Sequence, residues 1–296
     1  MELLAPVYYK KFHCIADQCT HSCCVGWEID VDGETLARYE ALTAPIGEEI
    51  RASLQRTREG VCFRLGEDER CPNLDGRGLC RIITALGEGY LCEICREHPR
   101  FYNRVGNCME CGLGACCEEA ARLMLQEADY ISLERVDILP DEDACGTDFD
   151  ARAARAAVLT TLSDQSIPYG ERPARLAQDH ALSLPVGAAL TRLLDSLEYL
   201  DGAHKALLIS LDEPADVTGD AALYCERFLA YLIYRHASAA QDAAAFRTAV
   251  GLALLLERLF RALTGGGLLS PVRAAVLLSE EMEYSEENTN AIRAVF

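Results

Sequence analysis

"FHCIADQCTHSCCVGW", residues Phe12–Trp27, places four cysteines within eleven positions of the chain. They are Cys14, Cys19, Cys23 and Cys24. So many thiols in one short stretch serve a disulfide framework, a redox pair or a metal site. The choice between these three decides the fold of this part of the chain, because loops held by a bound metal need little apolar core of their own.

The chain has the composition of a folded globular protein, since half of its 296 residues are hydrophobic. Its first residues, MELLAPVYYKKFHC, lack the basic and apolar regions of a secretory signal peptide. The longest apolar run, Ala249–Leu256, has eight residues, far below the roughly 20 that span a bilayer. We therefore expect a soluble cytoplasmic protein, in which thiols stay reduced and a metal site is favoured over disulfides.

The net charge of −19, from 28 basic and 47 acidic residues, limits the possible partners. An acidic surface repels phosphate groups, so we expect neither a nucleic acid nor an anionic membrane as a partner. A protein that presents lysine side chains is compatible with this charge, although acidity alone commonly serves solubility.

Cysteine usage divides the chain in two. Thirteen of the 15 cysteines lie between Cys14 and Cys117, in sequence rich in glycine and proline. Beyond residue 118 the sequence becomes rich in alanine and leucine with helical periodicity. We predict a cysteine-rich metal or iron–sulfur cluster module at 1–120 and an α-helical domain at 121–296. The predicted fold class is mostly α, with the loop-rich cysteine module packed on an α-helical bundle.

The predicted helices follow from apolar residues repeated at helical spacing. They cover residues 118–128, 189–200, 224–236, 246–263 and 286–296. The fourth is nearly apolar all round and is expected to be buried, and the last follows Ser285, a residue with N-cap chemistry. The segment LPDEDACGTDFDAR, residues 139–152, is the predicted linker.

Four groups of cysteines indicate a metal centre, because thiolate ligation needs several sulfurs that converge from tight turns. The groups are C-x4-C-x3-CC, CPNLDGRGLC, LCEIC and C-x2-C-x4-CC. Zinc and an iron–sulfur cluster both accept four cysteines, and this spacing does not separate them. A redox pair at Cys92 and Cys95 is disfavoured, because no βαβ pattern surrounds it. We interpret His13, His21 and His98 as polar loop residues rather than ligands.

The motifs F-x-C-x4-C-x3-CC-x-GW, CPNLDGRGLC, LGEGYLCEICREHPR and CEEAARL resemble those of the flagellin lysine-N-methylase family. That family belongs to a wider group of cysteine-cluster proteins described as zinc- or iron-chelating. The resemblance continues through YLIYRH and EEMEYSEEN, and so extends over nearly the whole chain. It implies methylation of lysines on flagellin, the protein of the bacterial flagellum, from S-adenosylmethionine, with an iron–sulfur cluster of the 4Fe–4S type.

The resemblance also implies a set of metal ligands. The cysteines that match the family pattern are Cys14, Cys19, Cys23, Cys24, Cys71, Cys80, Cys92, Cys95 and Cys117. Four further thiols match nothing in the pattern: Cys62, Cys108, Cys111 and Cys116. They either extend the metal site or are small buried residues. A 4Fe–4S cluster needs about four cysteines, so the matching ones serve two centres, or one centre with buried structural thiols.

Residues in the helical motifs that match the family are candidates for the walls of a reaction site, and these are Tyr234, Arg235, His236, Glu283 and Tyr284. The predicted substrate-binding residues are Trp27, Tyr234, His236 and Glu283. Helix packing and solvated charge are the alternative explanation of each, and Trp27 either packs over the metal centre or contacts the substrate. No residue is assigned as a catalytic base.

The site of the methyl donor is not evident from the sequence. No G-x-G-x-x-G follows a predicted strand, and the C-x3-C-x2-C triplet of radical enzymes does not occur. A methyl-transferring chain would therefore hold the donor in another pocket, in line with a neutral amine and shielded from water. The acidic segment SEEMEYSEEN either borders a groove for a lysine-bearing segment or carries carboxylates favoured by a helix dipole.

Two classes of function remain open. The first is a protein-lysine N-methyltransferase that acts on flagellin. The second is a non-catalytic zinc- or iron–sulfur-binding protein that serves redox chemistry, iron handling or as an adaptor. Transfer of a labelled methyl group to flagellin separates the two, and the sequence does not specify an oligomeric state.

Overall fold

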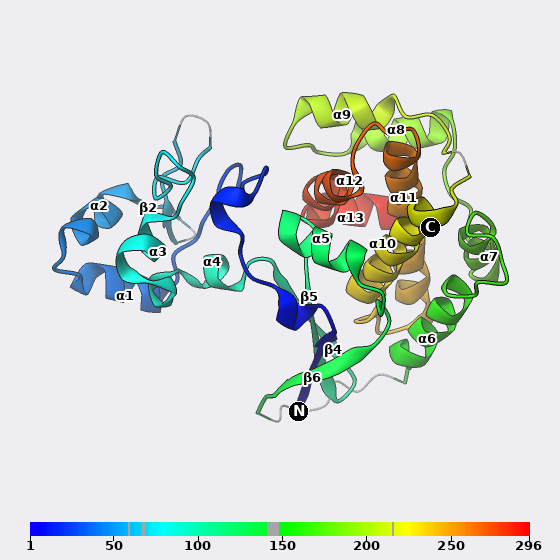
Figure 1. Ribbon diagram of the computed structural model, residues 1–296, viewed down its shortest axis with the longest axis horizontal. Helices are drawn as coiled ribbons and strands as arrows, with labels where there is room; N and C mark the ends of the chain where they lie inside the picture. The colour runs from blue at the N-terminus through cyan, green and yellow to red at the C-terminus, as the bar shows by residue number, and fades with distance from the viewer. Residues whose placement is uncertain (59, 67–68, 141–147, 215) are drawn as a thin grey trace. The chain divides into compact units, whose positions relative to one another are not determined.

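The computed structural model describes residues 1–58, 60–66, 69–140, 148–214 and 216–296 (Figure 1). Within these ranges the chain forms two compact units. We call His13–Pro99 the cysteine unit, and Met1–Phe12 together with Arg100–Phe296 the helical unit. About half of the described residues are helical and a smaller part forms sheets, so the chain contains more strand structure than the sequence predicts.

The division into units differs from the predicted boundary at residue 120. The structure separates the units between Phe12 and His13 and between Pro99 and Arg100. Strand pairing is the reason, because β1 (Glu2–Pro6) pairs in parallel with a strand that follows the cysteine unit. Of the predicted linker at 139–152, residues 141–147 lie outside the described part of the chain.

The helical unit contains a four-stranded sheet in the order β4-β5-β1-β6. β5 (Cys108–Leu113) and β1 occupy its centre, and β4 (Arg100–Val105) and β6 (Leu133–Ile138) pair with them antiparallel. The side chain of Cys111 on β5 is fully buried against β1 residues. Of the two explanations for the unmatched thiols, the position of Cys111 favours a small buried residue.

Helices make up most of the remaining helical unit. α10 (Gly219–Ala237) and α11 (Ala243–Gly265) lie side by side (Figure 1). α11 is buried over most of its length, as its apolar sequence predicts. The other helices here are α5 (Glu118–Gln126), α6 (Ala151–Leu162), α7 (Glu171–Asp179), α8 (Ala188–Ser196), α9 (Gly202–Ile209), α12 (Pro271–Leu278) and α13 (Glu286–Arg293). Within the described ranges no helix combines the length and the apolar content needed to cross a bilayer.

The C-terminal segment contains one irregular turn. α12 continues directly into a π-helix at Ser279–Glu283, where the Tyr284 N–H donates to the Ser279 carbonyl at 3.1 Å. α13 begins after Ser285, whose hydroxyl accepts a hydrogen bond from the Asn288 N–H at 3.1 Å. The predicted N-cap is therefore confirmed.

Glu281 and Glu283, two residues apart in the π-helix, reach different neighbours. The Glu281 carboxylate accepts hydrogen bonds from the N–H groups of Leu200 (2.8 Å) and Asp201 (3.2 Å), at the start of α9. Glu283 instead reaches α10. A π-turn widens the helix, and here it lets one short segment bind two others.

The cysteine unit is built from short elements. These are α1 (Gly33–Ala41), α2 (Pro45–Ser53), α3 (Arg81–Leu86), α4 (Glu93–Glu97) and the antiparallel pair β2 (Leu54–Arg56) and β3 (Val61–Phe63). Its core cluster contains eight buried residues, of which two, Cys71 and Cys92, are cysteines. The unit therefore has few large apolar side chains with which to stabilise itself.

Asp32 links the starts of two helices in the cysteine unit. One carboxylate oxygen accepts a hydrogen bond from the Thr35 N–H of α1 at 2.9 Å, and the other accepts one from the Glu93 N–H of α4 at 2.8 Å. Partial burial opposes ionisation, but the N–H donors outweigh it and lower the pKa of Asp32 to about 2. One carboxylate thus holds α4, which carries Cys95, against α1.

Candidate functional site

Five cysteines gather in the core of the cysteine unit. We call them the thiol cluster: Cys24, Cys71, Cys80, Cys92 and Cys95. Cys71 and Cys92 are buried and the other three are partly buried. A backbone hydrogen bond of 2.8 Å, from the Cys71 N–H to the Cys24 carbonyl, joins two of the contributing segments.

Local turn chemistry places the next thiol of the cluster. In the sequence CPNLDGRGLC, an Asp75 side-chain oxygen accepts hydrogen bonds from the N–H groups of Arg77 (2.8 Å) and Leu79 (2.9 Å). Gly78 adopts a φ of +81°, which favours glycine. This tight turn returns the chain to Cys80, which precedes α3.

The sulfur atoms of the thiol cluster are close enough to affect one another. A hydrogen bond between Cys95 and Cys92 lowers the pKa of Cys92 and raises that of Cys95. Burial raises the pKa of Cys71, and the neighbouring Cys80 and Cys92 add to the shift. These mutual effects place the thiols in one region of the unit.

The thiol cluster has the donor chemistry that zinc or an iron–sulfur cluster requires, since four or more thiols lie together. Within the described residues, no three Cys, His, Asp or Glu side chains are arranged so that they could hold one metal ion. No disulfide joins any of the described cysteines. The type and number of these side chains therefore fit a metal ion or an iron–sulfur cluster. Their thiols are free in this structure and do not occupy the positions of metal ligands.

The other predicted ligands lie outside this core. Cys14 is exposed and Cys19 is partly exposed. Cys23 lies beside His98 and adjoins the thiol cluster, because a hydrogen bond to Cys24, together with burial, raises the pKa of Cys23. Cys117 belongs to the helical unit, where it precedes α5.

A second feature lies in the helical unit, where a cavity of about 540 Å³ is lined by residues of β4, α10 and α13. We call it the Glu283 pocket, and its lining includes Asn103, Arg235, His236, Glu283, Tyr284 and Arg293. The volume suits a small-molecule ligand. The pocket brings together residues of YLIYRH and EEMEYSEEN, the two helical motifs in which the family resemblance was seen.

Glu283 is fully buried and contacts three side chains of α10. His236 Nε2 lies 2.7 Å and Arg235 Nε lies 3.3 Å from the same carboxylate oxygen. The Tyr231 hydroxyl donates to the other oxygen at 3.1 Å, and itself accepts a hydrogen bond from the Ala115 N–H at 2.9 Å. The negative charge of Glu283 is therefore paired within the protein, and its carboxylate orients the three side chains of α10.

Burial and pairing set the charges of this group. Burial lowers the pKa of His236 against the opposing effect of Glu283, so the imidazole is neutral at pH 7. Burial raises the pKa of Glu283, but Arg235 and His236 outweigh it and the pKa lies below its usual value. Arg235 stays charged, because its aromatic and acidic neighbours raise its pKa although burial lowers it.

The neutral imidazole of His236 has the chemistry of a proton acceptor. When Nε2 donates its hydrogen to Glu283, Nδ1 carries the available electron pair. Within the described residues the imidazole's hydrogen bond is the one to Glu283. A carboxylate that orients an imidazole in this way is a common support for a general base.

Several pocket residues were not predicted from the sequence. The Arg235 guanidinium lies 4.9 Å from the ring centroid of Phe101 and 4.5 Å from that of Tyr284. The Asn103 side chain donates to the Arg235 carbonyl at 2.8 Å. Cys116, one of the thiols without a family match, is buried beside Tyr284. Phe101 and Asn103 come from β4, and no local signal in the sequence connects that strand with α10.

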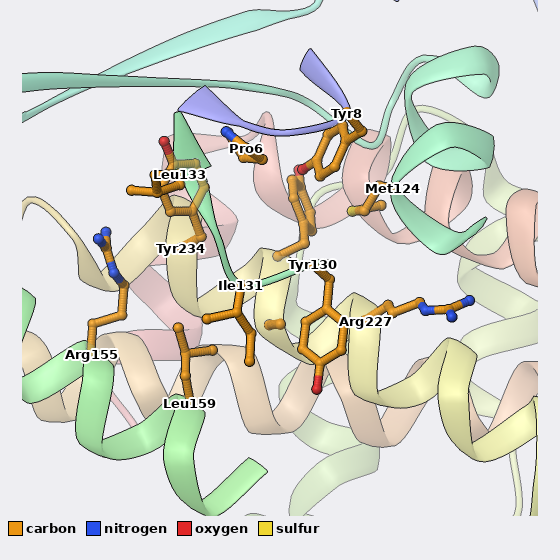
Figure 2. Close-up of a pocket in the computed structure, with 12 residues that line it drawn as sticks. Pro6, Tyr8, Met124, Tyr130, Ile131, Leu133, Arg155, Leu159, Arg227 and Tyr234 are labelled. Carbon is orange, nitrogen blue, oxygen red and sulfur yellow. The ribbon is translucent and has the colours of Figure 1, made fainter. Parts of the chain in front are cut away.

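The predicted residue Tyr234 lies outside the Glu283 pocket. It lines a separate hollow of about 20 Å³ (Figure 2), which has room for one water but not for a lysine side chain. The Tyr234 hydroxyl donates to the Cys111 carbonyl at 2.9 Å. Trp27 belongs to the cysteine unit and is partly exposed. Within the helical unit, the structure brings His236 and Glu283 together and leaves Tyr234 in a packing position.

The acidic segment SEEMEYSEEN does not form one exposed surface. Glu280, Glu281 and Glu283 are buried in the π-helix. Glu286 and Glu287 occupy the first turn of α13, where the helix dipole favours negative charge. Of these two, Glu286 also lines the Glu283 pocket.

Comparison with known proteins identifies relatives at low identity. The chain is 27% identical over 134 residues to the flagellar biosynthetic protein FliU of Salmonella muenchen, covering 43% of this chain and 79% of that protein. It is 26% identical over 140 residues to a lysine-N-methylase of Salmonella typhimurium, covering 45% of this chain and 35% of the relative. A lysine-N-methylase of Salmonella choleraesuis matches to the same extent.

The chain thus spans about a third of the length of the lysine-N-methylases that it matches. No family model matches the chain, and no solved structure matches it. These comparisons do not bear on the wider group of cysteine-cluster proteins. They confirm the resemblance to the lysine-N-methylases over nearly half of this chain's length, and not over nearly the whole chain as the motifs predict.

Proposed function

We propose that this chain is a protein-lysine N-methyltransferase that modifies flagellin with methyl groups from S-adenosylmethionine. The observation that carries the proposal is the meeting of His236 with Glu283 and Tyr284 in one pocket of ligand size. The similarity to lysine-N-methylases supports the reaction class. The similarity to a flagellar biosynthetic protein supports flagellin as the substrate. The reaction would take place in the cytoplasm, where the thiol cluster stays reduced.

Within the proposal, the thiol cluster would hold an iron–sulfur cluster of the 4Fe–4S type, with zinc as the alternative. The bound group would supply folding free energy to the cysteine unit. Cys14, Cys19, Cys23 and Cys117 stay predictions from the family resemblance, and no step of the reaction depends on them.

The pocket residues have separable parts in the proposed reaction. A lysine side chain enters as an ammonium and must lose a proton before its nitrogen can attack a methyl group. His236 Nδ1 accepts that proton, and the Glu283 carboxylate beside Nε2 stabilises the imidazolium that results, against the opposing positive charge of Arg235. The new N–CH₃ bond then forms as the S–CH₃ bond of the donor breaks, and its electron pair stays on sulfur. Phe101 and Tyr284 form apolar walls that limit water beside the amine.

The test is transfer of labelled methyl groups from S-adenosylmethionine to purified flagellin. His236→Gln should lower the rate by about 100-fold or more, the usual contribution of a general base. Its rate should recover partly at high pH, where lysine loses its proton without help. His180→Gln, the same substitution outside the pocket, is the matched control and should keep full activity. Wild-type protein that carries its metal and transfers no methyl group would support the non-catalytic metal-binding function instead.

A further inference from the structure

Arg293 stands out among the residues of the Glu283 pocket. It lies in the last turn of α13, is half-buried and lines the cavity. Its Nε is buried and has no hydrogen-bond partner, and no ion pair joins its guanidinium to a described carboxylate. Burial lowers the pKa of Arg293, with no acidic neighbour opposing the shift. A cation in such a place lacks the anion that would stabilise it.

Two buried arginines of the helical unit have acidic partners within the chain. Arg155 binds Glu110, which is fully buried, and Arg172 binds Glu226 at 2.6 Å. Arg227 and Arg273 also have a buried nitrogen without a hydrogen-bond partner. Arg293 differs from them because it lines the Glu283 pocket, where a ligand can supply its anion.

The other charges of the pocket define what kind of ligand fits. The positive charge of Arg235 is paired with the negative charge of Glu283, and His236 is neutral at pH 7. Together these three residues carry no net charge and would not attract an anion. Glu286 lines the same cavity, is exposed and makes no ion pair within the described residues. A simple anion such as phosphate would be attracted by Arg293 and repelled by Glu286.

Glu286 and Arg293 lie on the same face of α13. Seven residues separate them, which is two helical turns and a rise of about 10 Å. Both side chains are long enough to reach towards each other along the helix, but Glu286 and Arg293 do not contact each other directly. The space between an unmatched carboxylate and an unmatched guanidinium suits a small group that carries both an ammonium and a carboxylate.

We propose that the Glu283 pocket binds the α-amino-acid group of a small ligand, with its carboxylate on Arg293 and its ammonium towards Glu286. Under the proposed function, on which this identification of the ligand rests, that group is the methionine part of S-adenosylmethionine. A free amino acid has the same chemistry and is the other possible source. Arg293 is then a binding residue for the donor in the same pocket as the proton acceptor His236.

The test is calorimetric titration of the full chain with S-adenosylhomocysteine, with methylthioadenosine, which lacks the amino-acid group, and with methionine. Wild-type protein should bind S-adenosylhomocysteine more tightly than methylthioadenosine. Arg293→Gln should weaken S-adenosylhomocysteine binding by about tenfold or more, the usual effect of losing a charge-assisted hydrogen bond, and leave methylthioadenosine unchanged. Glu286→Gln should weaken it less. Arg192→Gln, an exposed arginine of α8, is the matched control and should bind as wild type.

The outcomes separate this proposal from the proposed function. Equal binding of S-adenosylhomocysteine by wild type and Arg293→Gln would overturn the amino-acid site, whatever the methyl transfer assay shows. Binding of methionine without S-adenosylhomocysteine, lost in Arg293→Gln, would support the site and overturn the methyl donor as its occupant. Binding of none of the ligands by wild type would overturn the site. Arg293→Lys, which keeps the charge, should recover part of the affinity and shows that the loss is not a failure to fold.

Discussion

The two units of this chain use different means of stabilisation. The main core cluster of the helical unit contains 45 buried residues, mostly leucine, alanine and aromatic side chains of α10, α11 and α12. The core cluster of the cysteine unit contains eight, and two of them are cysteines. Since burial of apolar area is the main source of folding free energy, the helical unit can support itself. Under the proposed function, the cysteine unit gains the folding free energy that its small core lacks from the group that its thiols bind.

The units also differ in where they bury charge. The helical unit holds fully or nearly fully buried carboxylates on its core elements, each with a cation or a set of N–H donors, as at Glu110, Glu226 and Glu283. Such pairs add little net stability but are costly to break on one side. In the cysteine unit, Asp32 performs a similar linking task from a more exposed position. The comparison therefore predicts that mutations in the two units will lower stability by different amounts, which are described below from the largest to the smallest.

The largest expected effect is on the cysteine unit. Structural metal sites supply on the order of 10 kcal/mol, so Cys95→Ser should cost several kcal/mol and leave this unit sensitive to protease. The helical unit should remain folded by circular dichroism. Purified without oxygen, the wild-type protein should contain iron and acid-labile sulfide, and the variant should contain less.

The matched control is Cys62→Ala, because Cys62 is buried in the same unit but lies outside the thiol cluster. Mapped proteolytic fragments distinguish the two variants. Equal protection of residues 13–99 in both variants, with and without bound metal, would show that the cysteine unit is held together by its apolar core after all.

The next effect is on the helical unit. Glu283→Gln leaves Arg235 buried without its carboxylate, and breaking a buried pair on one side costs about 3–5 kcal/mol. We expect a lower melting temperature for the helical signal in circular dichroism, with the cysteine unit unchanged. Glu287→Gln, an exposed neighbour in the first turn of α13, should have a much smaller effect, below about 1 kcal/mol. If the two variants melt together, Glu283 does not stabilise the unit as described.

The smallest effect concerns pH. The pKa of Asp32 is lowered to about 2 by N–H donors that exist only in the folded state. Its contribution is therefore fully present above the unfolded pKa of about 3.9 and is lost as the pH falls towards 2. Asn keeps one acceptor oxygen and loses the other, so Asp32→Asn should lower the stability of the cysteine unit at pH 7 by about 1 kcal/mol, the net value of one hydrogen bond.

The difference between wild type and Asp32→Asn should vanish as the pH falls from about 4 to 2. Trp27 is the one tryptophan of the chain and lies in the cysteine unit, so its fluorescence reports unfolding of this unit alone. A difference that stays constant over this pH range would show that the carboxylate does not cap α1 and α4.

The sequence predicts five helices, α5, α8, α10, α11 and α13, because their signals are local, and it does not predict α6, α7, α9 and α12. The apolar periodicity of α11 and the N-cap at Ser285 lie within a few residues of the features that they determine. The sheet was missed, because β4 and β5 carry charges and thiols that resemble loop sequence. β5 also pairs with β1, which lies about 100 residues earlier in the chain. Strand propensity depends strongly on such tertiary context.

The same contrast applies to the Glu283 pocket. His236 and Glu283 were found through the family motifs, and the structure adds that they touch. Asn103 and Arg293 could not be found, because their importance comes from position alone. Neither is in a recognisable motif, and the lack of a partner for Arg293 is visible only once all neighbouring charges are placed.

The π-turn at Ser279–Glu283 has a consequence for the history of the chain. An α-helix that accommodates one added residue takes this form. Removing one residue there would rotate everything that follows by about 100°, and the contacts of Glu281 with α9 and of Glu283 with α10 could not both persist. A relative whose sequence is one residue shorter at this position would therefore have inherited the helices without the carboxylate that orients His236.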